Sequence, residues 1–282
     1  MAENSKIAWC DDTFNPWIGC QKVSAGCLNC YAERQNNFYK WVPEWGKDYR
    51  LTGSANWAKP IQWAKHAVKD GVTRRVFCAS LADVFDKNVS QEWREKLFDL
   101  IEVTEVIGGL EWLILTKRPE NIWSMSPIRW CADEARNVRI GITCENQEMA
   151  DKRIPLLLNA WSGKNFISVE PMLSAVSLRN IKPINFKNRQ DDVLFGKTYI
   201  DNSLRGAIFE GGKTIDWVIA GCESDDNKKP GRPCNIEWVR DLRDQCQVSN
   251  TPFFLKQLSI DGKLVTEPEL DGRQWLEFPG EK

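Results

Sequence analysis

The sequence predicts an α/β fold in which parallel strands and helices alternate as a partial or complete parallel (β/α) barrel. Short apolar runs rich in Val, Ile, Phe and Trp recur along the chain, and each is followed by a polar cluster and then a helix-like segment. The length of 282 residues is close to the roughly 250 residues that such a barrel uses. The polar clusters would lie at the carboxyl ends of the strands, where barrels keep their active sites.

The apolar runs and periodic segments define the expected elements in order along the chain. Helices are expected where apolar residues recur at helical spacing, and Ser90 is a candidate cap for the first of them. Pro155 predicts a kink or an early end of the second helix. The expected strands are 14–19, 75–79, 112–115, 138–142, 166–169, 217–220 and 253–255, and the expected helices are Gln91–Ile107, 146–158 and 236–246.

Three stretches depart from this alternation. Residues 182–212 contain clustered charges and several glycines without periodicity, which predicts an insertion or lid. Residues 259–282 are expected to form a C-terminal extension that packs outside the barrel or frays. The barrel domain is therefore assigned to residues 1–258. Residues 35–58 are aromatic and polar and are expected to form a long connection.

Composition excludes several classes of protein. The net charge of −1 creates no overall field that would attract polyanions, so contact with nucleic acid would need a local basic patch. The N-terminus lacks a basic segment followed by an apolar run, and no stretch reaches the roughly 18 apolar residues of a membrane span. We therefore expect a soluble cytoplasmic protein without membrane contact.

The cysteine and histidine content favours cofactor chemistry. Ten cysteines in a chain of this size without an export signal are expected to be reduced thiols rather than disulfides. His66 is the single histidine, so histidine-based zinc catalysis and serine or cysteine triads are poorly supplied.

Cys20, Cys27 and Cys30 lie close together in the segment NPWIGCQKVSAGCLNCYAER. A four-iron, four-sulfur cluster normally takes four thiolates, so a loop that offers three leaves one iron open to a small molecule. Gly26 is expected to provide the tight turn that brings Cys20 back to the other two. The alternative is a structural zinc site with Cys10 as fourth thiolate, in which case the protein would be a zinc-stabilised, non-catalytic binding module.

These residues carry a family resemblance. The spacing C-x6-C-x2-C, followed by Tyr31 and Ala32, resembles the cluster loop of radical S-adenosylmethionine enzymes, whose usual spacing is C-x3-C-x2-C with an aromatic residue after the last cysteine. More closely, the chain resembles the phage gene-product 37/68 family, a divergent branch of that superfamily. The similarity covers most of the chain, through NPWIGC, SLADVF, LTKRPENI, ITCENQEMADKRIP, SVEPML, DWVIAGCES, WVRDLRDQC and PFFLKQ.

The resemblance implies a barrel of the radical S-adenosylmethionine type that uses a 4Fe-4S cluster and S-adenosyl-L-methionine. One electron from the reduced cluster would cleave S-adenosylmethionine to methionine and a 5′-deoxyadenosyl radical, which abstracts hydrogen from the substrate. An external one-electron donor such as flavodoxin or ferredoxin is expected. By analogy with phage proteins, the substrate class would be a nucleic acid base, a nucleotide or a small precursor, and the alternative is a peptide or protein substrate.

The resemblance also assigns cofactor-binding roles after the first three strands. Tyr31 resembles the aromatic residue near adenine, and its alternative role is helix packing. The superfamily's Gly-Gly-Glu-like motif is absent, so Ser80 and Asp83 are the candidates for the methionine amino group, against a turn residue and a helix cap. Thr116 and Lys117 are candidates for the methionine carboxylate, against a solvated basic turn.

Further candidates follow the later strands. Glu145 and Asn146 are placed where the superfamily binds ribose hydroxyls. Glu170 and Glu223 are expected to face the barrel mouth as catalytic carboxylates, or else to cap the next segments. The spacing of Cys222, Cys234 and Cys246 lacks a short chelating pair, so buried or free thiols are expected there rather than a second cluster.

Overall fold

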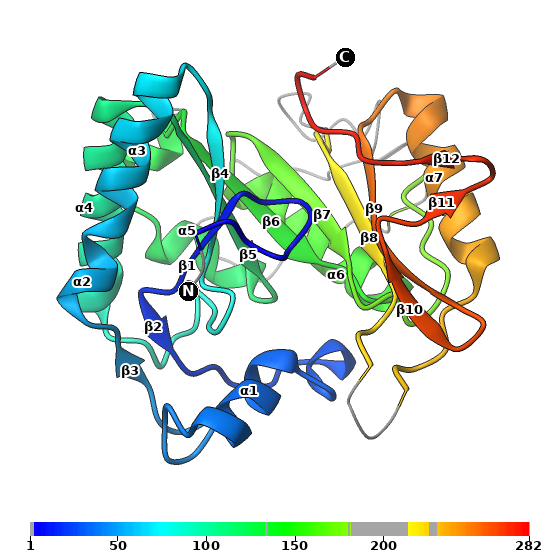
Figure 1. The fold of residues 1–282 in the computed structure, drawn as a ribbon, viewed down its shortest axis with the longest axis horizontal. Helices are drawn as coiled ribbons and strands as arrows, with labels where there is room; N and C mark the ends of the chain where they lie inside the picture. The colour runs from blue at the N-terminus through cyan, green and yellow to red at the C-terminus, as the bar shows by residue number, and fades with distance from the viewer. Residues whose placement is uncertain (1–2, 133–134, 180, 182–213, 226–229, 282) are drawn as a thin grey trace, which may run out of the picture. The chain divides into compact units, whose positions relative to one another are not determined.

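The computed structural model describes residues 3–132, 135–179, 181, 214–225 and 230–281 (Figure 1). The expected insertion at 182–212 lies outside the described residues. The chain divides into two compact units, Met1–Gly141 and Ile142–Lys282. In both units parallel strands are separated by helices along the chain, so the predicted α/β class is confirmed. None of the helices in the described ranges combines the length and the apolar character that a membrane crossing requires.

The first unit is built on neighbouring parallel strands whose ends align. Strands β1 (Asp12–Phe14), β4 (Arg74–Cys78) and β5 (Leu110–Thr116) pair in that order, and β6 (Val138–Thr143) follows and continues into the second unit. Phe14 is in register with Cys78, and Cys78 with Ile114. The loops that leave these strands therefore start at one edge of the sheet.

Helices α3 (Lys59–Asp70) and α4 (Gln91–Ile107) pack against each other in this unit, as Figure 1 shows. Helix α4 has the predicted bounds. The buried side chains of Leu97, Phe98 and Ile101 recur at helical spacing, which is the pattern that predicts a helix here. The expected connection at 35–58 instead contains the end of α1, the short strand Arg50–Leu51, the short helix Ser54–Trp57 and a loop. The remaining helices of this unit are α1 (Tyr31–Tyr39), α2 (Ser54–Trp57), α5 (Ile122–Met125) and the 3-10 helices Ala25–Cys27, Pro119–Asn121 and Ile128–Ala132.

The first expected strand, 14–19, is wrong as a single element. The chain leaves the main sheet after Phe14, and β2 (Trp17–Ile18) pairs antiparallel with β3 (Arg50–Leu51). Pro16 separates the two strands because it has no N–H to donate to a ladder. Its carbonyl oxygen instead accepts hydrogen bonds from the Thr52 N–H and hydroxyl at 3.0 and 2.8 Å.

The second unit contains the strand order β6, β7 (Asn165–Val169), β8 (Val218–Gly221), β9 (Phe253–Ile260) and β10 (Lys263–Thr266). Strands β7, β8 and β9 are parallel neighbours, whereas β10 is antiparallel to β9. Helices α6 (Gln147–Ala160) and α7 (Ile236–Ser249) connect them along the chain. Helix α6 continues through Pro155 to Ala160, so the expected early end does not occur.

The segment after Ser259 is ordered by its own hairpins. A turn at Asp261 and Gly262 joins β9 to β10, and β11 (Glu269–Leu270) pairs with β12 (Arg273–Gln274). Trp275 is buried, and its carbonyl oxygen accepts a 2.7 Å hydrogen bond from the Leu255 N–H. The expected boundary at 258 therefore falls inside β9.

The β11–β12 turn predicts a local dependence on pH. Hydrogen bonds from Arg240 and then Arg243 lower the pKa of Asp271 to about 2. This value lies below the roughly 3.9 of an unfolded aspartate, so the stabilisation is complete above that pH and disappears as the pH falls towards the folded value. We expect Asp271→Asn to lower the free energy of unfolding in urea more at about pH 6 than at about pH 3. An equal effect at both pH values would contradict this account.

Candidate functional site

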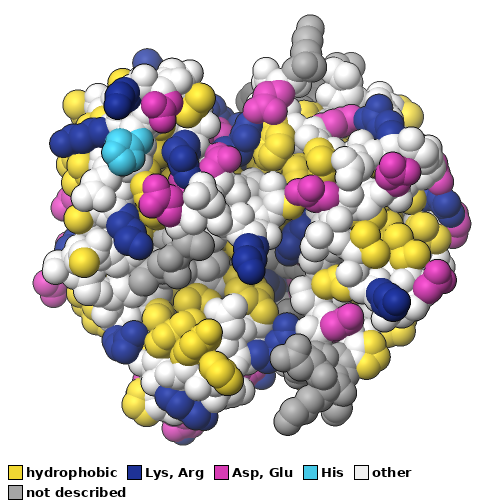
Figure 2. Space-filling view, viewed as in Figure 1, with side chains coloured by type: hydrophobic (Ala, Val, Ile, Leu, Met, Phe, Trp, Pro, Cys, Tyr) yellow, Lys and Arg dark blue, Asp and Glu magenta, His cyan; other side chains and the backbone are white. Residues whose placement is uncertain are grey.

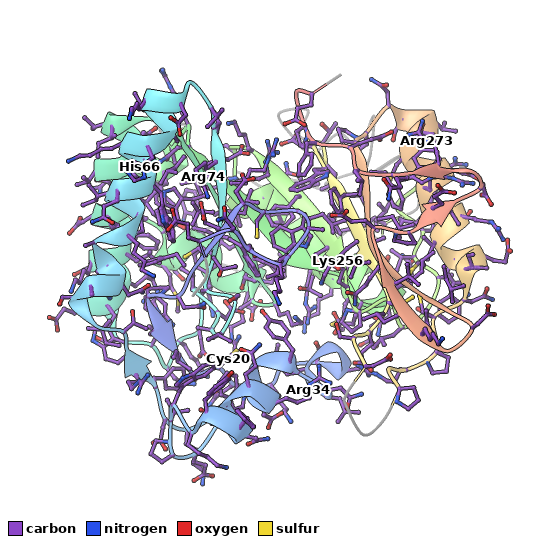
Figure 3. All side chains as sticks on the ribbon, viewed as in Figure 1. Cys20, Arg34, His66, Arg74, Lys256 and Arg273 are labelled. Atoms are coloured by element: carbon purple, nitrogen blue, oxygen red, sulfur yellow. The ribbon has the colours of Figure 1, made fainter. Side chains whose placement is uncertain are left out.

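The cysteine loop lies near the carboxyl end of strand β4. The Gly19 N–H donates a 3.1 Å hydrogen bond to the Leu81 carbonyl oxygen, just after that strand ends. Figure 3 places Cys20 and Arg34 at the α1 end of the first unit, whereas Arg74, the first residue of β4, lies away from them. The loop thus occupies the edge at which sequence patterns placed the site.

Gly19 permits the close approach of two backbones immediately before Cys20. It has a φ of +124°, and a Cβ added there would lie 2.5 Å from the Asp48 carbonyl oxygen. A side chain would therefore meet both backbone strain and a steric clash. Gly26, which was expected to make the tight turn, lies instead within the 3-10 helix Ala25–Cys27.

The three candidate ligands are free thiols with partial exposure. Cys27 ends the 3-10 helix and Cys30 precedes α1, so both lie within a few residues of Cys20 along one loop. Three free thiols are the donor chemistry that an iron-sulfur cluster or a zinc ion requires. In the part of the chain that the structure describes, no group of three or more His, Cys, Asp or Glu side chains is arranged to hold a metal ion. The three thiols are chemically suitable ligands for a cluster or a zinc ion. The described structure does not bring them together around one metal position.

The surroundings of Cys20 favour the neutral thiol. Burial first and the neighbouring Asp83 second raise the pKa of Cys20 to about 12, although Arg118 acts in the opposite direction. The thiol is therefore protonated near neutral pH in the metal-free protein. Metal binding at Cys20 would release a proton.

Tyr31 and Ser80, two predicted cofactor residues, are brought into contact. The Tyr31 hydroxyl donates a hydrogen bond to the Ser80 carbonyl oxygen, and the Ser80 hydroxyl accepts one from Asn15 Nδ2 at 2.9 Å. Ala79 directly precedes Ser80 with a φ of 63°, a strained conformation for a residue with a side chain. The backbone turn at the end of β4 therefore fixes where Ser80 lies.

Asp83 organises the turn after β5. Its Oδ1 accepts a 2.7 Å hydrogen bond from the Thr116 hydroxyl, and its Oδ2 accepts a 3.1 Å bond from the Lys117 N–H. Oδ1 also accepts from the Phe85 N–H at 3.0 Å. The structure thus joins the predicted residues Asp83, Thr116 and Lys117, and the carboxylate is satisfied by protein groups.

Arg118 and Asp86 belong to this site and were not among the predicted residues. Arg118 Nη1 lies 2.9 Å from Asp83 Oδ2, and Nη2 lies 3.0 Å from Asp86 Oδ2. The Tyr49 hydroxyl also donates to Asp86 Oδ2 at 2.9 Å, and burial followed by the neighbouring Asp86 raises the pKa of Tyr49. The sequence signal was the polar cluster after the third apolar run, which does not distinguish an inward Arg118 from an inward Lys117.

In the second unit, both residues assigned to ribose have structural partners. Glu145 is fully buried, and its Oε2 lies 2.7 Å from Nη1 of Arg153, which also donates to the Thr143 carbonyl oxygen. Asn146 caps α6, since its Oδ1 accepts a 2.9 Å hydrogen bond from the Met149 N–H. Their assignment to ribose stays a prediction.

Glu170 directly follows β7, and its side chain lies beside the end of β8 and beside Lys256 of β9. Its Oε1 is 3.1 Å from Lys256 Nζ, and its Oε2 accepts a 3.4 Å hydrogen bond from the Ser168 hydroxyl. A Cβ added to Gly221 would lie 2.7 Å from Glu170 Oε1, so the glycine provides the space that the carboxylate occupies. The Glu170 carboxylate therefore lies beside the Lys256 ammonium, in a space that a side chain at position 221 would fill.

Glu223 and the Cys222 thiol contact the loop that precedes α7. Glu223 Oε2 accepts hydrogen bonds from the Arg232 N–H and Nε at 3.0 and 2.9 Å, and this contact raises the pKa of Arg232. A hydrogen bond from Cys234 lowers the pKa of Cys222. Cys222, Cys234 and Cys246 form no disulfide, and whether they hold a second cluster stays a prediction.

We expect Gly19→Ala to lower the free energy of unfolding by about 2 kcal/mol, because the added methyl group meets the Asp48 backbone and the φ angle is strained. The measurement is urea unfolding followed by tryptophan fluorescence. Gly53→Ala is the control, since a Cβ there meets nothing within 4 Å, and its effect should stay below about 1 kcal/mol. Equal effects of the two changes would contradict the assigned role of Gly19.

Comparisons with known proteins give one family and one structural likeness. No curated protein matches the sequence. Among solved structures, a point mutant of spore photoproduct lyase is similar with a TM-score of 0.48 and 11% identity, over 85% of this chain and 74% of that chain. The model of the family described as "Protein of unknown function (DUF5131)" matches residues 4–279, and the chain belongs to that family.

Proposed function

We propose that the protein is a radical S-adenosylmethionine enzyme in which Cys20, Cys27 and Cys30 hold a 4Fe-4S cluster. The observation that carries this proposal is the set of three free thiols on one loop. The loop starts beside the end of β4, where Tyr31 and Ser80 are in contact. The similarity to the phage gene-product 37/68 family supports the same assignment.

The residues around the loop would bind and orient the cofactor. A half-exposed Tyr31 ring can stack against adenine while its hydroxyl stays bound to the Ser80 carbonyl oxygen. The Ser80 hydroxyl, held by Asn15, would accept from the methionine amino group. Asp83 would act indirectly, because it accepts from the Thr116 hydroxyl and the Lys117 N–H and so fixes the turn that carries the Lys117 ammonium, which would pair with the methionine carboxylate.

With the cluster and S-adenosylmethionine bound, the chemistry supplied is one-electron cleavage to methionine and a 5′-deoxyadenosyl radical that abstracts hydrogen from substrate. This chain would exclude water and position the reactants. No protein acid or base is needed for the cleavage, which agrees with a chain whose only histidine is His66. Glu170 and Glu223 are the candidates for contact with substrate.

An external one-electron donor such as flavodoxin or ferredoxin would reduce the cluster. Figure 2 shows hydrophobic side chains gathered on the surface over α1, the helix that begins directly after Cys30. Phe38 is 80% exposed and Tyr39 59% exposed. Exposed apolar groups of this kind are typical of protein interaction sites and support docking of a donor near the loop.

The substrate class that we propose is a nucleic acid base or nucleotide, on the family resemblance. The net charge of −1 provides no overall attraction to polyanions. Arg232, a cation of the loop that precedes α7, is paired with Glu223. A single nucleotide or small precursor therefore suits the described surface better than a long polymer.

A zinc-stabilised binding module is the second candidate, because the same three thiols are also zinc ligands. The two functions differ in colour and metal content. Oxygen-free preparation should yield a brown protein with iron and sulfide for the enzyme, and a colourless protein with stoichiometric zinc for the module. Zinc without iron would overturn the proposed reaction.

We expect Cys27→Ala to lose iron, colour and the formation of 5′-deoxyadenosine and methionine, because the loop then offers two thiolates. Both products are measured by chromatography after anaerobic reduction. Cys246→Ala is the matched control, since this thiol is buried in α7 and should not affect iron content. Turnover that persists in Cys27→Ala would refute the assignment.

Ser80→Ala is expected to raise the KM for S-adenosylmethionine about fivefold with a smaller change in kcat, because one hydrogen bond to the bound cofactor is lost. Ser124→Ala changes an exposed serine of the same unit whose hydroxyl donates to the Asn121 carbonyl oxygen, and it should leave KM unchanged. Product formation at varied S-adenosylmethionine concentration separates the two variants. An unchanged KM in Ser80→Ala would remove Ser80 from the cofactor site.

A further inference from the structure

One buried guanidinium contacts the first cysteine and both carboxylates of the site. Arg118 Nη1 lies 3.8 Å from Cys20 Sγ and donates to Asp83 Oδ2 at 2.9 Å. Nη2 donates to the Gln21 carbonyl oxygen at 2.9 Å and to Asp86 Oδ2 at 3.0 Å. Arg118 is 5% exposed, so these contacts exist where water competes little. The side chain thus joins the start of the cysteine loop to the turn after β4.

Two arginines are buried near Cys20, and Arg118 is the one that would face a thiolate formed at Cys20. Asp83 and Asp86 are buried, and Arg118 pairs with both, so its single positive charge balances one of their two negative charges. Arg94 is the second buried cation here, but it donates to the carbonyl oxygens of Val84, Asp86 and Val89. A metal-bound thiolate at Cys20 would add a negative charge beside the Arg118 fork.

We propose that Arg118 is a positioning residue for Cys20, which holds the start of the cysteine loop and donates a hydrogen bond to the ligand sulfur. This inference rests on the proposed function only in taking Cys20 as a metal ligand. Groups around ligands orient them and tune the metal, and hydrogen bonds to cluster sulfurs shift the reduction potential. Arg118 therefore sets both the metal affinity of the loop and the potential of its cluster.

The geometry requires arginine rather than any cation. Two nitrogens of one planar group reach a sulfur, a carbonyl oxygen and two carboxylates that come from different segments. Lysine carries the same charge as a single ammonium on a flexible stem and cannot present this fork. Arg118→Lys therefore removes the geometry while it keeps a charge opposite Asp83 and Asp86, which limits the risk of unfolding.

The test compares Arg118→Lys with Arg94→Lys, which changes a similarly buried arginine of the same unit that contacts no sulfur. Metal-free proteins are titrated with cobalt(II) under oxygen-free conditions, and thiolate-to-cobalt absorption reports binding. We expect Arg118→Lys to weaken cobalt affinity about tenfold or more. We expect Arg94→Lys to stay within about twofold of the wild type, since no contact of its group reaches the loop.

A second readout is the midpoint potential of the reconstituted cluster, measured by spectroelectrochemistry. It should become more negative in Arg118→Lys and stay unchanged in Arg94→Lys, because only the first loses a donor to sulfur. Equal cobalt affinities and equal potentials in wild type and Arg118→Lys would overturn the positioning role. A wild-type chain that takes up cobalt but neither loads iron nor forms 5′-deoxyadenosine would defeat the proposed function alone.

Discussion

The buried pairing of Asp83 and Asp86 with the Arg118 guanidinium underlies the whole cysteine-loop region. Removing one partner of such a group leaves an uncompensated charge, which typically costs about 3–5 kcal/mol. Each of the three side chains also binds the backbone around it. Asp83 accepts from the Lys117 N–H, Asp86 accepts from the Asn88 N–H, and Arg118 donates to the Gln21 carbonyl oxygen. The electrostatic need to satisfy these charges is therefore what brings the loops together.

The strand register makes that pairing available. Because Phe14, Cys78 and Ile114 are in register, the turns that follow β1, β4 and β5 leave the sheet at one edge. Asn15 after β1 bonds the Ser80 hydroxyl and the Leu81 N–H in the turn after β4, and Asp83 of that same turn accepts from Thr116 at the end of β5. A site at the carboxyl ends of strands is thus a consequence of parallel pairing, and its chemistry depends on which side chains the turns present.

Local periodicity was enough to predict α4 and the central strands, because Leu97 and Ile101 repeat at helical spacing and residues 112–115 of β5 are a continuous apolar run. Local periodicity did not predict the side-chain pairs whose members are separated in the sequence. Glu145 was assigned to a cofactor, yet Arg153 lies against it. Arg118 was passed over for Lys117, since the direction of a side chain in a loop is decided by partners distant in sequence. Asp86, which is 32 residues from Arg118, had no local signal at all.

Glu277 supplies hydrogen-bond acceptors to the starts of two strands in the second unit. The Glu277 carboxylate accepts a 3.0 Å hydrogen bond from the Phe253 N–H, and its carbonyl oxygen accepts one from Trp217 Nε1 at 2.9 Å. Two neighbouring strands, β8 and β9, thus begin beside groups supplied by Glu277. Position 277 must be synthesised before either strand gains these partners, so both hydrogen bonds form well after the strands themselves have left the ribosome's catalytic centre.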